Sequence, residues 1–437
     1  MPTKLDRFVV YRDYTGSIFA EGMDTTLQGE SFSDVVQRAI SKLPKYGGEI
    51  QIKSGVYDIK NTIEIDRPIV FTGVRAGPKE DVPEKDMTAL VATSGLSGAV
   101  IKVTGANCRR RWMFGTEISD LTIVGDPDSD TGTDCIRFKS ENDALIRNLS
   151  IERLVLDSAP RHGIHFEDVN KHIQIRDVWI GHCVGNAYEL TSGDRYWLTN
   201  CYGYLSYYGF HASQSVDSIS ITASHFRQND RGGVIIRSPF YQFLGGRVID
   251  NNGPGIDIAG ARGTVIGAEA VNNTEHGIVL RGHEQRDTRG NRILGNYIGN
   301  TSMKTDQSGT TQGHGPLGAA RAFQQTANNY GFKEAVDRTV RYVSAFGTDE
   351  ASKQKYGIAI GSGVTDTVVD NNVIEGNVED PIYGDGTRSC INGSGVNDGP
   401  PTEVGEWQGH GREGLDVWDR VNENLYKYVG GAWRGPL

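Results

Sequence analysis

A short pattern of glycine, apolar residue, any residue and apolar residue recurs along the chain and predicts its fold. Copies begin at Gly163, Gly209, Gly233, Gly255 and Gly277, and a variant copy that starts with Ala187 lies between the first two. With this copy included, the interval from one copy to the next is 22 to 24 residues. The alternation indicates that the apolar side chains face a core while the middle one faces outward. A constant interval of this length is typical of a solenoid.

Two further alternating stretches follow each copy. Examples are the segments 173–175 and 178–180, with the polar residue Asp177 between them and Asn200 at the equivalent place one repeat later. Asn and Asp tolerate the left-handed backbone of a tight corner. Three short strands per repeat therefore predict an all-β fold, a right-handed parallel β-helix with coils of about 22–24 residues.

The ends of the solenoid must be closed, because open ends expose sheet edges and core. Apolar residues spaced as on one helix face between Phe32 and Leu43, with Ser31 as a helix-capping residue, predict a cap helix. We expect N-terminal strands or an attachment segment over 1–30, the cap helix and first coils over 31–90, the parallel β-helix over 91–386 with a helical insertion at 301–355, and a small C-terminal β module over 387–437.

Composition narrows the function classes. The chain has 437 residues and a net charge of −10, and 37% of its residues are hydrophobic. This charge argues against a nucleic-acid partner. No apolar run is long enough to span a bilayer, and no apolar segment follows the charged N-terminus, so we expect neither membrane insertion nor a signal peptide. The five cysteines include no CxxC pair and predict no zinc site.

Short stretches at both ends resemble known β-helix proteins. The series Ala20-Glu21-Gly22, the predicted cap helix and Gly55-Val56-Tyr57 resembles the N-terminal cap of pectate-lyase-like β-helix proteins, including viral tailspikes and fibres. The segments 384–388 and 431–433 are similar to β-helix proteins of haloarchaea and archaeal tailed viruses. The resemblance implies an extracellular glycan-facing role, often as a trimer and sometimes with lyase or hydrolase activity. The catalytic motifs of polygalacturonases, alginate epimerases and pectate lyases are absent from the sequence.

The outward position of the repeat carries candidate catalytic residues. It is occupied in three successive coils by His165, Glu189 and His211. Adjacent coils lie about 4.8 Å apart, so these side chains are expected within roughly 10 Å of one another. A carboxylate between two imidazoles suits general acid–base chemistry or a divalent cation. The alternative is a solvated row of unlike charges with no task.

Aromatic residues at outward positions are candidates for carbohydrate binding. We place Trp197 and Phe243 outward on the second strand, and Trp179, Tyr202 and His225 outward on the third. Sugars stack their C–H faces on exposed rings. The alternative is that the rings are covered by the insertion or by a neighbouring subunit.

Three functional hypotheses follow. The first is a tailspike-like virion surface adhesin that binds host polysaccharide or glycoprotein glycan. The second is a polysaccharide lyase or glycoside hydrolase acting on an acidic polysaccharide, and the third is a purely structural virion component. In each case we expect a homotrimer that contacts other virion proteins, is made in the host cytoplasm and is displayed on the virion surface. No cofactor is expected, although a divalent cation is compatible with the candidate residues.

Overall fold

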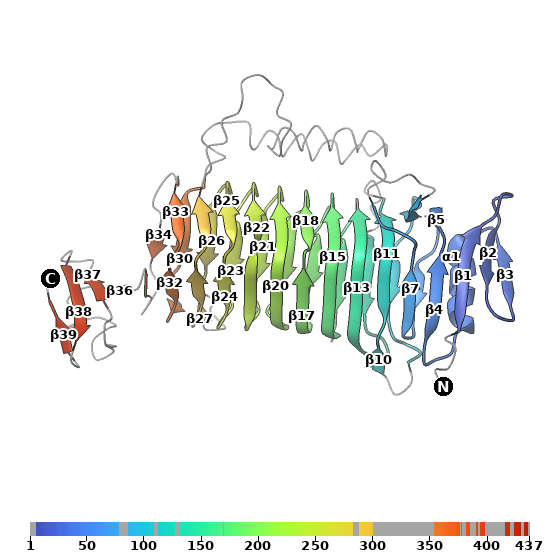
Figure 1. Ribbon diagram of the computed structural model, residues 1–437, viewed down its shortest axis with the longest axis horizontal. Helices are drawn as coiled ribbons and strands as arrows, with labels where there is room; N and C mark the ends of the chain where they lie inside the picture. Colours follow the sequence, from blue (N-terminus) through green and yellow to red (C-terminus); the bar gives the residue numbers. More distant parts are fainter. Residues whose placement is uncertain are drawn as a thin grey trace, which may run out of the picture.

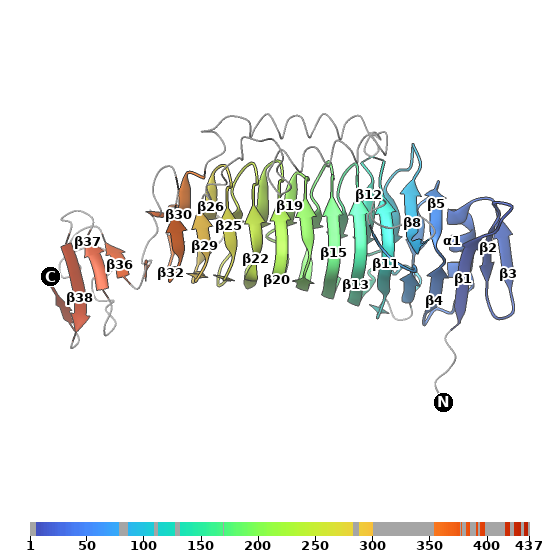
Figure 2. The ribbon, with the colours of Figure 1, turned by 45° about the horizontal axis from the view of Figure 1, so that its top comes forward.

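The protein is a right-handed parallel β-helix whose coils stack along one long axis (Figures 1 and 2). The computed structural model describes residues 6–77, 86–108, 112–126, 132–168, 170–282, 288–299 and 354–375, residue 377, and short stretches at 382–384, 390–391, 394–397, 416–419, 424–429 and 432–435. The predicted insertion lies outside these residues except for its last two positions. The predicted division of the chain into domains stays a prediction.

The N-terminal cap forms as the sequence predicts. Helix α1 (Phe32–Lys42) begins after Ser31, whose hydroxyl accepts a hydrogen bond from the backbone of Asp34. A cap of this kind typically stabilises a helix by about 1 kcal/mol. Strands β1 (Arg7–Arg12), β2 (Ile18–Glu21) and β3 (Thr26–Gly29) pair antiparallel, and β1 continues parallel to β4 (Gly48–Ile52). The buried face of α1 therefore joins the solenoid core at the end where the coils begin (Figure 1).

Two large parallel sheets make up the coils. The first sheet takes one short strand from each coil, and it includes the strands predicted from the repeated pattern. Its members are β6 (Ile63–Ile65), β9 (Ala99–Val103), β12 (Asp134–Lys139), β14 (Ile164–Glu167), β16 (Tyr188–Leu190), β19 (Tyr208–Ala212), β21 (Gly232–Ile236), β23 (Ile256–Ile258), β26 (His276–Leu280), β30 (Tyr356–Ile360) and β34 (Ile382–Gly384). We call it the short-strand sheet.

The second sheet takes the remaining two strands of each coil, which are often continuous. Its members after β4 are β5 (Gly55–Ile59), β7 (Ile69–Thr72), β8 (Thr88–Ala92), β10 (Trp112–Phe114), β11 (Glu117–Val124), β13 (Leu145–Asp157), β15 (Asn170–Gly181), β17 (Gly193–Thr199), β18 (Tyr202–Tyr204), β20 (Val216–Arg227), β22 (Tyr241–Ile249), β24 (Thr264–Ile266), β25 (Glu269–Val271), β28 (Arg292–Leu294), β29 (Tyr297–Gly299), β32 (Val368–Asp370), β33 (Val373–Glu375) and β35 (Cys390–Ile391). We call it the long-strand sheet. A pair of two-residue strands, β27 (Thr288–Arg289) and β31 (Val364–Thr365), lies outside both sheets.

A row of left-handed residues divides each long strand into its two halves. Asp177, Asn200 and Ala223 have φ values of 55°, 52° and 49°, and the residues on either side of them pair coil to coil. Asp177 and Asn200 are among the predicted corner residues, and the Asn200 side chain donates a hydrogen bond to Asp177 at 2.6 Å. The first half of each long strand thus presents one outward row and the second half another.

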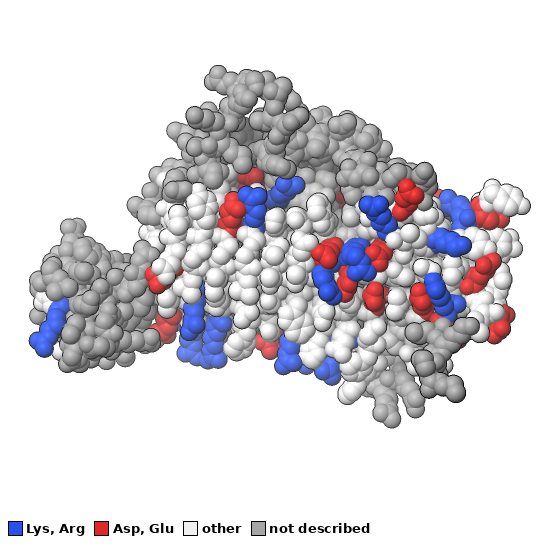
Figure 3. Space-filling view, viewed as in Figure 1, with Lys and Arg blue, Asp and Glu red and all other residues white. Residues whose placement is uncertain are grey.

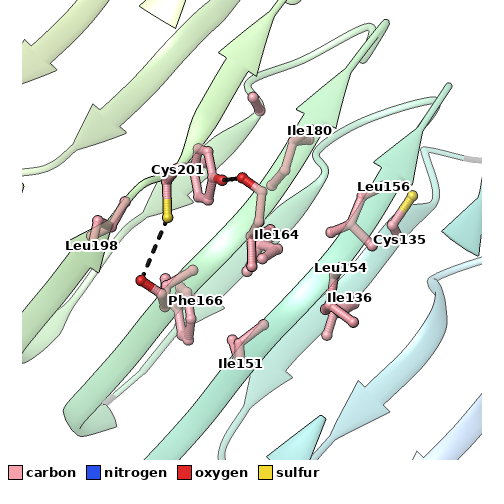
Figure 4. Packing of buried hydrophobic residues seen from close by; sticks show 14 of the residues in the cluster. Cys135, Ile136, Ile151, Leu154, Leu156, Ile164, Phe166, Ile180, Leu198 and Cys201 are labelled. Atoms are coloured by element: carbon pink, nitrogen blue, oxygen red, sulfur yellow. Dashed lines mark hydrogen bonds between the residues drawn. The ribbon is translucent and has the colours of Figure 1, made fainter. Parts of the chain in front are cut away.

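The interior of the solenoid is a single apolar core. Figure 4 shows part of it, with Ile151, Leu154, Ile164 and Phe166 packed between the sheets. Cys201 lies in the same core, where burial raises the pKa of its thiol to about 12. Inward-facing residues of successive coils stack on themselves, so the core grows along one axis only.

Three buried asparagines continue this stacking at one corner. The side chain of Asn229 donates to Asn251 at 2.8 Å, and that of Asn251 donates to Asn273 at 2.9 Å. All three side chains are fully buried. Their amides also hydrogen-bond to backbone groups that face the corner.

The glycine of the repeated pattern makes room for these amides. A Cβ at Gly233 would lie 2.9 Å from Asn251 Nδ2 and 2.2 Å from Val248 Cγ1, and a Cβ at Gly255 would lie 2.6 Å from Asn273 Nδ2. Real Cβ atoms do not approach neighbours so closely. The glycine recurs because the amide row packs directly against the backbone there.

The described residues near the C-terminus include four further short strands. Strand β36 (Ser394–Asn397) runs parallel to β37 (Asp416–Asp419), which pairs antiparallel with β38 (Asn424–Val429), and β38 pairs antiparallel with β39 (Ala432–Arg434). These strands agree with the small C-terminal β module predicted from the sequence.

Candidate functional site

The short-strand sheet places the three candidate catalytic residues in one outward row. His165 on β14 pairs with Glu189 on β16, and Glu189 pairs with His211 on β19. The row continues to Ile235 on β21, while Arg137 on β12 precedes His165. The predicted alignment of these positions is therefore present in the structure.

Glu189 and His211 form a direct pair. The Nδ1 atom of His211 lies 3.0 and 2.9 Å from the two carboxylate oxygens of Glu189, and Asn186 also donates to this carboxylate. Glu189 is buried, which by itself would raise its pKa. The hydrogen bond and charge of His211, together with His162 and Asn186, outweigh burial and hold the pKa of Glu189 below its usual range. The pair is a carboxylate that orients a partly exposed imidazole.

His165 belongs to a different set of contacts. Its Nδ1 lies 3.3 Å from Asp134 Oδ2, 3.1 Å from Arg161 Nη2 and 3.4 Å from a carboxylate oxygen of Glu167. Burial would raise the pKa of Asp134, but hydrogen bonds from Arg161 and His165 hold it below its usual range. The structure therefore brings Glu189 and His211 into hydrogen-bond contact and leaves His165 in a buried ion-pair network.

Sequence reasoning missed four residues of this site: Asp134, Arg161, His162 and Asn186. Asp134 is the first residue of β12, and the other three lie in the segments that lead into β14 and β16. These segments do not follow the period-two pattern. The available signal was that each of the four lies three or four residues before an outward position of the row.

Asp134, His162 and His165 are the described residues closest to a metal-binding arrangement, with ligand atoms within 4.8 Å of one another. Burial lowers the pKa of His162 to about 4, so its imidazole is neutral at neutral pH. However, Arg161 bonds to both oxygens of Asp134, and the backbone of Asn186 donates to His162 Nδ1. A cation would have to displace a guanidinium group, so this arrangement fits an ion-pair network better than a metal site.

An aromatic row crosses the outward face of the long-strand sheet. Trp179 on β15 pairs with Tyr202 on β18, and Tyr202 pairs with His225 on β20. The rings of Trp179 and Tyr202 stack with centroids 4.2 Å apart and planes 27° apart, and those of Tyr202 and His225 lie 4.7 Å apart. Trp179 is 44% exposed. The three residues predicted on the third strand therefore form a row of ring contacts, stacked between Trp179 and Tyr202 and tilted by 46° between Tyr202 and His225, which we call the aromatic row.

The two candidates on the second strand have opposite orientations. Trp197 is outward and 40% exposed, as predicted, whereas the prediction for Phe243 is wrong, because its side chain is fully buried in the core. Strand β22 places Gln242, not Phe243, in the outward row that contains Trp197 and Ser220. The two faces of a strand alternate, so counting one residue out of register reverses the orientation.

Charged residues on this face gather away from the aromatic row (Figure 3). A mixed cluster lies over β11, β13 and β15, where Arg153 pairs with Asp120 and Arg176 pairs with Glu152. Arg247, next to His225 in its row, forms two hydrogen bonds with Glu269. Over β17 and β20 the face shows few charges. Apolar rings bordered by polar groups are thus exposed together there.

Comparison with known proteins shows a likeness of fold. A family model described as periplasmic copper-binding protein (NosD) matches residues 113–312, which is less than half of the chain. The A-module of the Azotobacter vinelandii mannuronan C-5 epimerase AlgE6 superposes with a TM-score of 0.55 at 15% identity, over 83% of this chain and 94% of that one. No curated protein sequence matches the chain.

Two viral proteins have similar structures. The Dettilon tailspike protein (gp208) has a TM-score of 0.54 at 12% identity, over 82% of this chain and 61% of that one. ORF18 of Geobacillus virus E2 has a TM-score of 0.51 at 13% identity, over 65% of this chain and 64% of that one. The alignment thus spans less than two thirds of either viral protein. These similarities establish the parallel β-helix and nothing more specific.

The copper implied by the partial family match does not fit the described residues. Among the described residues, the one group of three potential His, Cys, Asp or Glu ligands consists of Asp134, His162 and His165. In this group, Arg161 already binds Asp134. Burial raises the pKa of Cys135 well above its usual value and that of Cys201 to about 12, so neither thiol is a ready thiolate ligand. Within the described part of the chain, no helix is both long and apolar enough to cross a bilayer.

Proposed function

We propose that the protein binds carbohydrate on the outward face of its long-strand sheet, as a tailspike-like adhesin displayed on a virion surface. The observation that carries the proposal is the row of Trp179, Tyr202 and His225. A partly exposed indole stacked on a phenol places apolar ring atoms beside hydrogen-bonding groups, and carbohydrate sites combine these two kinds of group. The fold shared with a phage tailspike supports the virion setting of this proposal.

Within this proposal, the partners are a host surface polysaccharide or glycoprotein glycan, further copies of the chain in a homotrimer, and other virion proteins. Burial of His225 and the neighbouring arginines Arg247 and Arg227 lower its pKa, so the ring at the end of the row is neutral at neutral pH. A neutral ring donates and accepts hydrogen bonds at once, as sugar hydroxyls require. Binding at the aromatic row therefore does not require a charged glycan.

The test is binding of the purified protein to a panel of immobilised glycans. Replacing Trp179 and Tyr202 together by Ala is expected to weaken binding by about tenfold or more, because each stacking contact contributes about 0.5–1.5 kcal/mol. Trp112→Ala is the matched control, since Trp112 is 52% exposed but lies on β10, outside the row. Equal losses in both variants, or none in either, would contradict the proposal.

The Glu189–His211 pair favours a second candidate function, cleavage of a polysaccharide. In this candidate, the carboxylate orients the imidazole, and His211 takes or delivers a proton at the sugar. Mass spectrometry of sugars released from host-envelope polysaccharides tests it. Release that is lost in His211→Ala and strongly reduced in Glu189→Gln supports cleavage. Unsaturated ends identify a lyase and saturated reducing ends a hydrolase, whereas no release across the panel removes the candidate.

A further inference from the structure

A second outward row runs along the first halves of the long strands, across the left-handed corner from the aromatic row. Trp197 pairs with Ser220, Ser220 with Gln242, Gln242 with Thr264, and Thr264 with Arg292. Five consecutive coils contribute one residue each, so the row spans about 19 Å at about 4.8 Å per coil. This length matches a short stretch of an extended polymer, and we call the row the axial row.

The chemistry of the axial row changes steadily along its length. It begins with the exposed ring of Trp197, continues through the hydroxyl and amide groups of Ser220, Gln242 and Thr264, and ends at the exposed guanidinium of Arg292. Hydroxyl and amide groups donate and accept hydrogen bonds, whereas a guanidinium only donates, in a fork that matches a carboxylate. The row thus offers a stacking end, a polar middle and an anion-binding end.

Phe240 and Arg262 lie beside the basic end, on the corner that precedes these strands. Phe240 is 47% exposed, and the guanidinium of Arg262 lies over its ring, 5.7 Å from the centroid. Phe240 also has a φ of 54°, which is rare for a bulky residue. The contact with the ring leaves the hydrogen-bonding edge of Arg262 available to a ligand.

The two arginines differ from others on the same sheet. Among the described residues, no carboxylate pairs with Arg262 or Arg292, whereas Arg153, Arg176 and Arg247 each contact one. Figure 3 shows basic groups gathered at the lower edge of this face, near β24 and β27. On a protein with a net charge of −10, a basic surface of this kind favours a local anionic ligand.

Acidic residues lie near both ends of the axial row. Asp217, which is exposed, sits three residues before Ser220 in β20, and Asp194 sits three residues before Trp197 in β17. Asp194 is neighboured by Lys171 at 3.9 Å and by Arg195 at 3.7 Å. At the other end, Asp366 and Asp370 belong to the coil that follows Arg292, so the basic end is distinguished by its two arginines without a carboxylate partner among the described residues and not by an absence of acidic residues.

We infer that the axial row binds an acidic polysaccharide laid along the solenoid axis, with sugar carboxylates at Arg262 and Arg292 and a sugar ring stacked on Trp197. This inference rests on the proposed glycan binding and adds to it the class of the glycan. Carboxylate-bearing sugars match the row because they combine an apolar ring face for Trp197, hydroxyls for the polar middle and an anion for the two arginines.

The experiment compares polygalacturonate, alginate and hyaluronan with the carboxyl-reduced form of each polymer, using the intact protein. The three acidic forms are expected to bind more tightly than the reduced forms. Arg262→Ala combined with Arg292→Ala should weaken binding of the acidic forms by about tenfold, since two exposed charge contacts are lost, and should leave the reduced forms unchanged. Higher salt should weaken wild-type binding more than binding of this variant.

The matched control is Arg153→Ala combined with Arg176→Ala, which removes the same net charge from the same sheet away from the axial row. A loss equal to that of the Arg262 and Arg292 variant would overturn the inference, because net charge alone would then explain it. Equal binding of acidic and reduced polymers would overturn the acidic class and leave glycan binding intact. The inference would also be overturned if none of the three acidic polymers bound to the protein. The proposed function fails only if the wider glycan panel shows no binding either.

Discussion

Replacing Asn251 by Ala is expected to destabilise the protein strongly, although this residue is not a member of any candidate site. The side chain makes four hydrogen bonds: it accepts from the backbone and side-chain amides of Asn229 at 3.1 and 2.8 Å, and it donates to Phe226 O at 3.2 Å and to Asn273 at 2.9 Å. All of these groups are buried, so water cannot replace the missing partner. The amide connects two coils at this corner, beside the backbone hydrogen bond from Asn252 to Asn229 at 2.9 Å.

The magnitude follows from what each partner keeps. The side chain of Asn229 retains its bond to Gly203 O, and Asn273 still accepts from the backbone of Asn251. The backbone amide of Asn229 loses the one partner the structure gives it, and an unsatisfied buried donor costs about 1–3 kcal/mol. The other lost bonds, at about 0.5–1.5 kcal/mol each, and the cavity bring the expected loss to about 3–5 kcal/mol.

Urea denaturation followed by tryptophan fluorescence measures the loss. Asn252→Ala is the matched control, because its half-buried side chain only accepts one long bond from Thr274 at 3.3 Å, and its expected cost is below about 1 kcal/mol. Asn251→Asp is informative as well, since the carboxylate keeps the shape but cannot donate. If Asn251→Ala and Asn252→Ala unfold at the same urea concentration, the reasoning about the amide row is refuted.

Two further predictions concern the orientation of side chains and the buried network. Phe243→Ala should lower the unfolding free energy by about 3–5 kcal/mol because it empties a filled core position. Trp197→Ala should lower it by under about 1 kcal/mol and should weaken ligand binding instead. Urea denaturation of the two variants measures this difference. Stability should fall as the pH drops from about 6.5 toward 4, because the unfolded state protonates His162 in that range while the folded state keeps it neutral. The lowered pKa values of Asp134 and Glu189 reduce stability in the same direction at lower pH. Denaturation midpoints of wild type and His162→Gln across this range test the assignment, and a flatter dependence in the variant is the expected outcome.

The short-strand sheet was predictable from the sequence because each of its strands repeats the same alternation. The pairing of His165 with Glu189, and of Glu189 with His211, follows from counting residues within that pattern. The error at Phe243 arose where Phe240, Tyr241, Phe243 and Leu244 are all apolar, so that alternation alone allows both registers. Gln242, polar between two buried rings, was the residue that marked the correct one.

The partners of His165 were not predictable in the same way. Asp134 and Arg161 come from two consecutive coils and meet because the segments leading into β12 and β14 bring them together. No periodicity governs these segments, and the contact depends on side-chain rotamers. The sequence therefore predicts which residues share a row, but not which of them hydrogen-bond.

The outward rows of the two sheets differ in burial, and this difference bears on the choice between binding and cleavage. On the short-strand sheet, the outward residues Ile235, Val279 and Ala359 are apolar and buried, and the outward Asp257 is buried between Arg237 and Arg281, whereas Tyr383 on the last strand is exposed. Strands with two buried faces are covered on both sides. The outward rows of the long-strand sheet remain exposed over several coils. An extended glycan therefore finds an accessible surface on the long-strand sheet, whereas access to Glu189 is confined to the edge at which His211 is partly exposed.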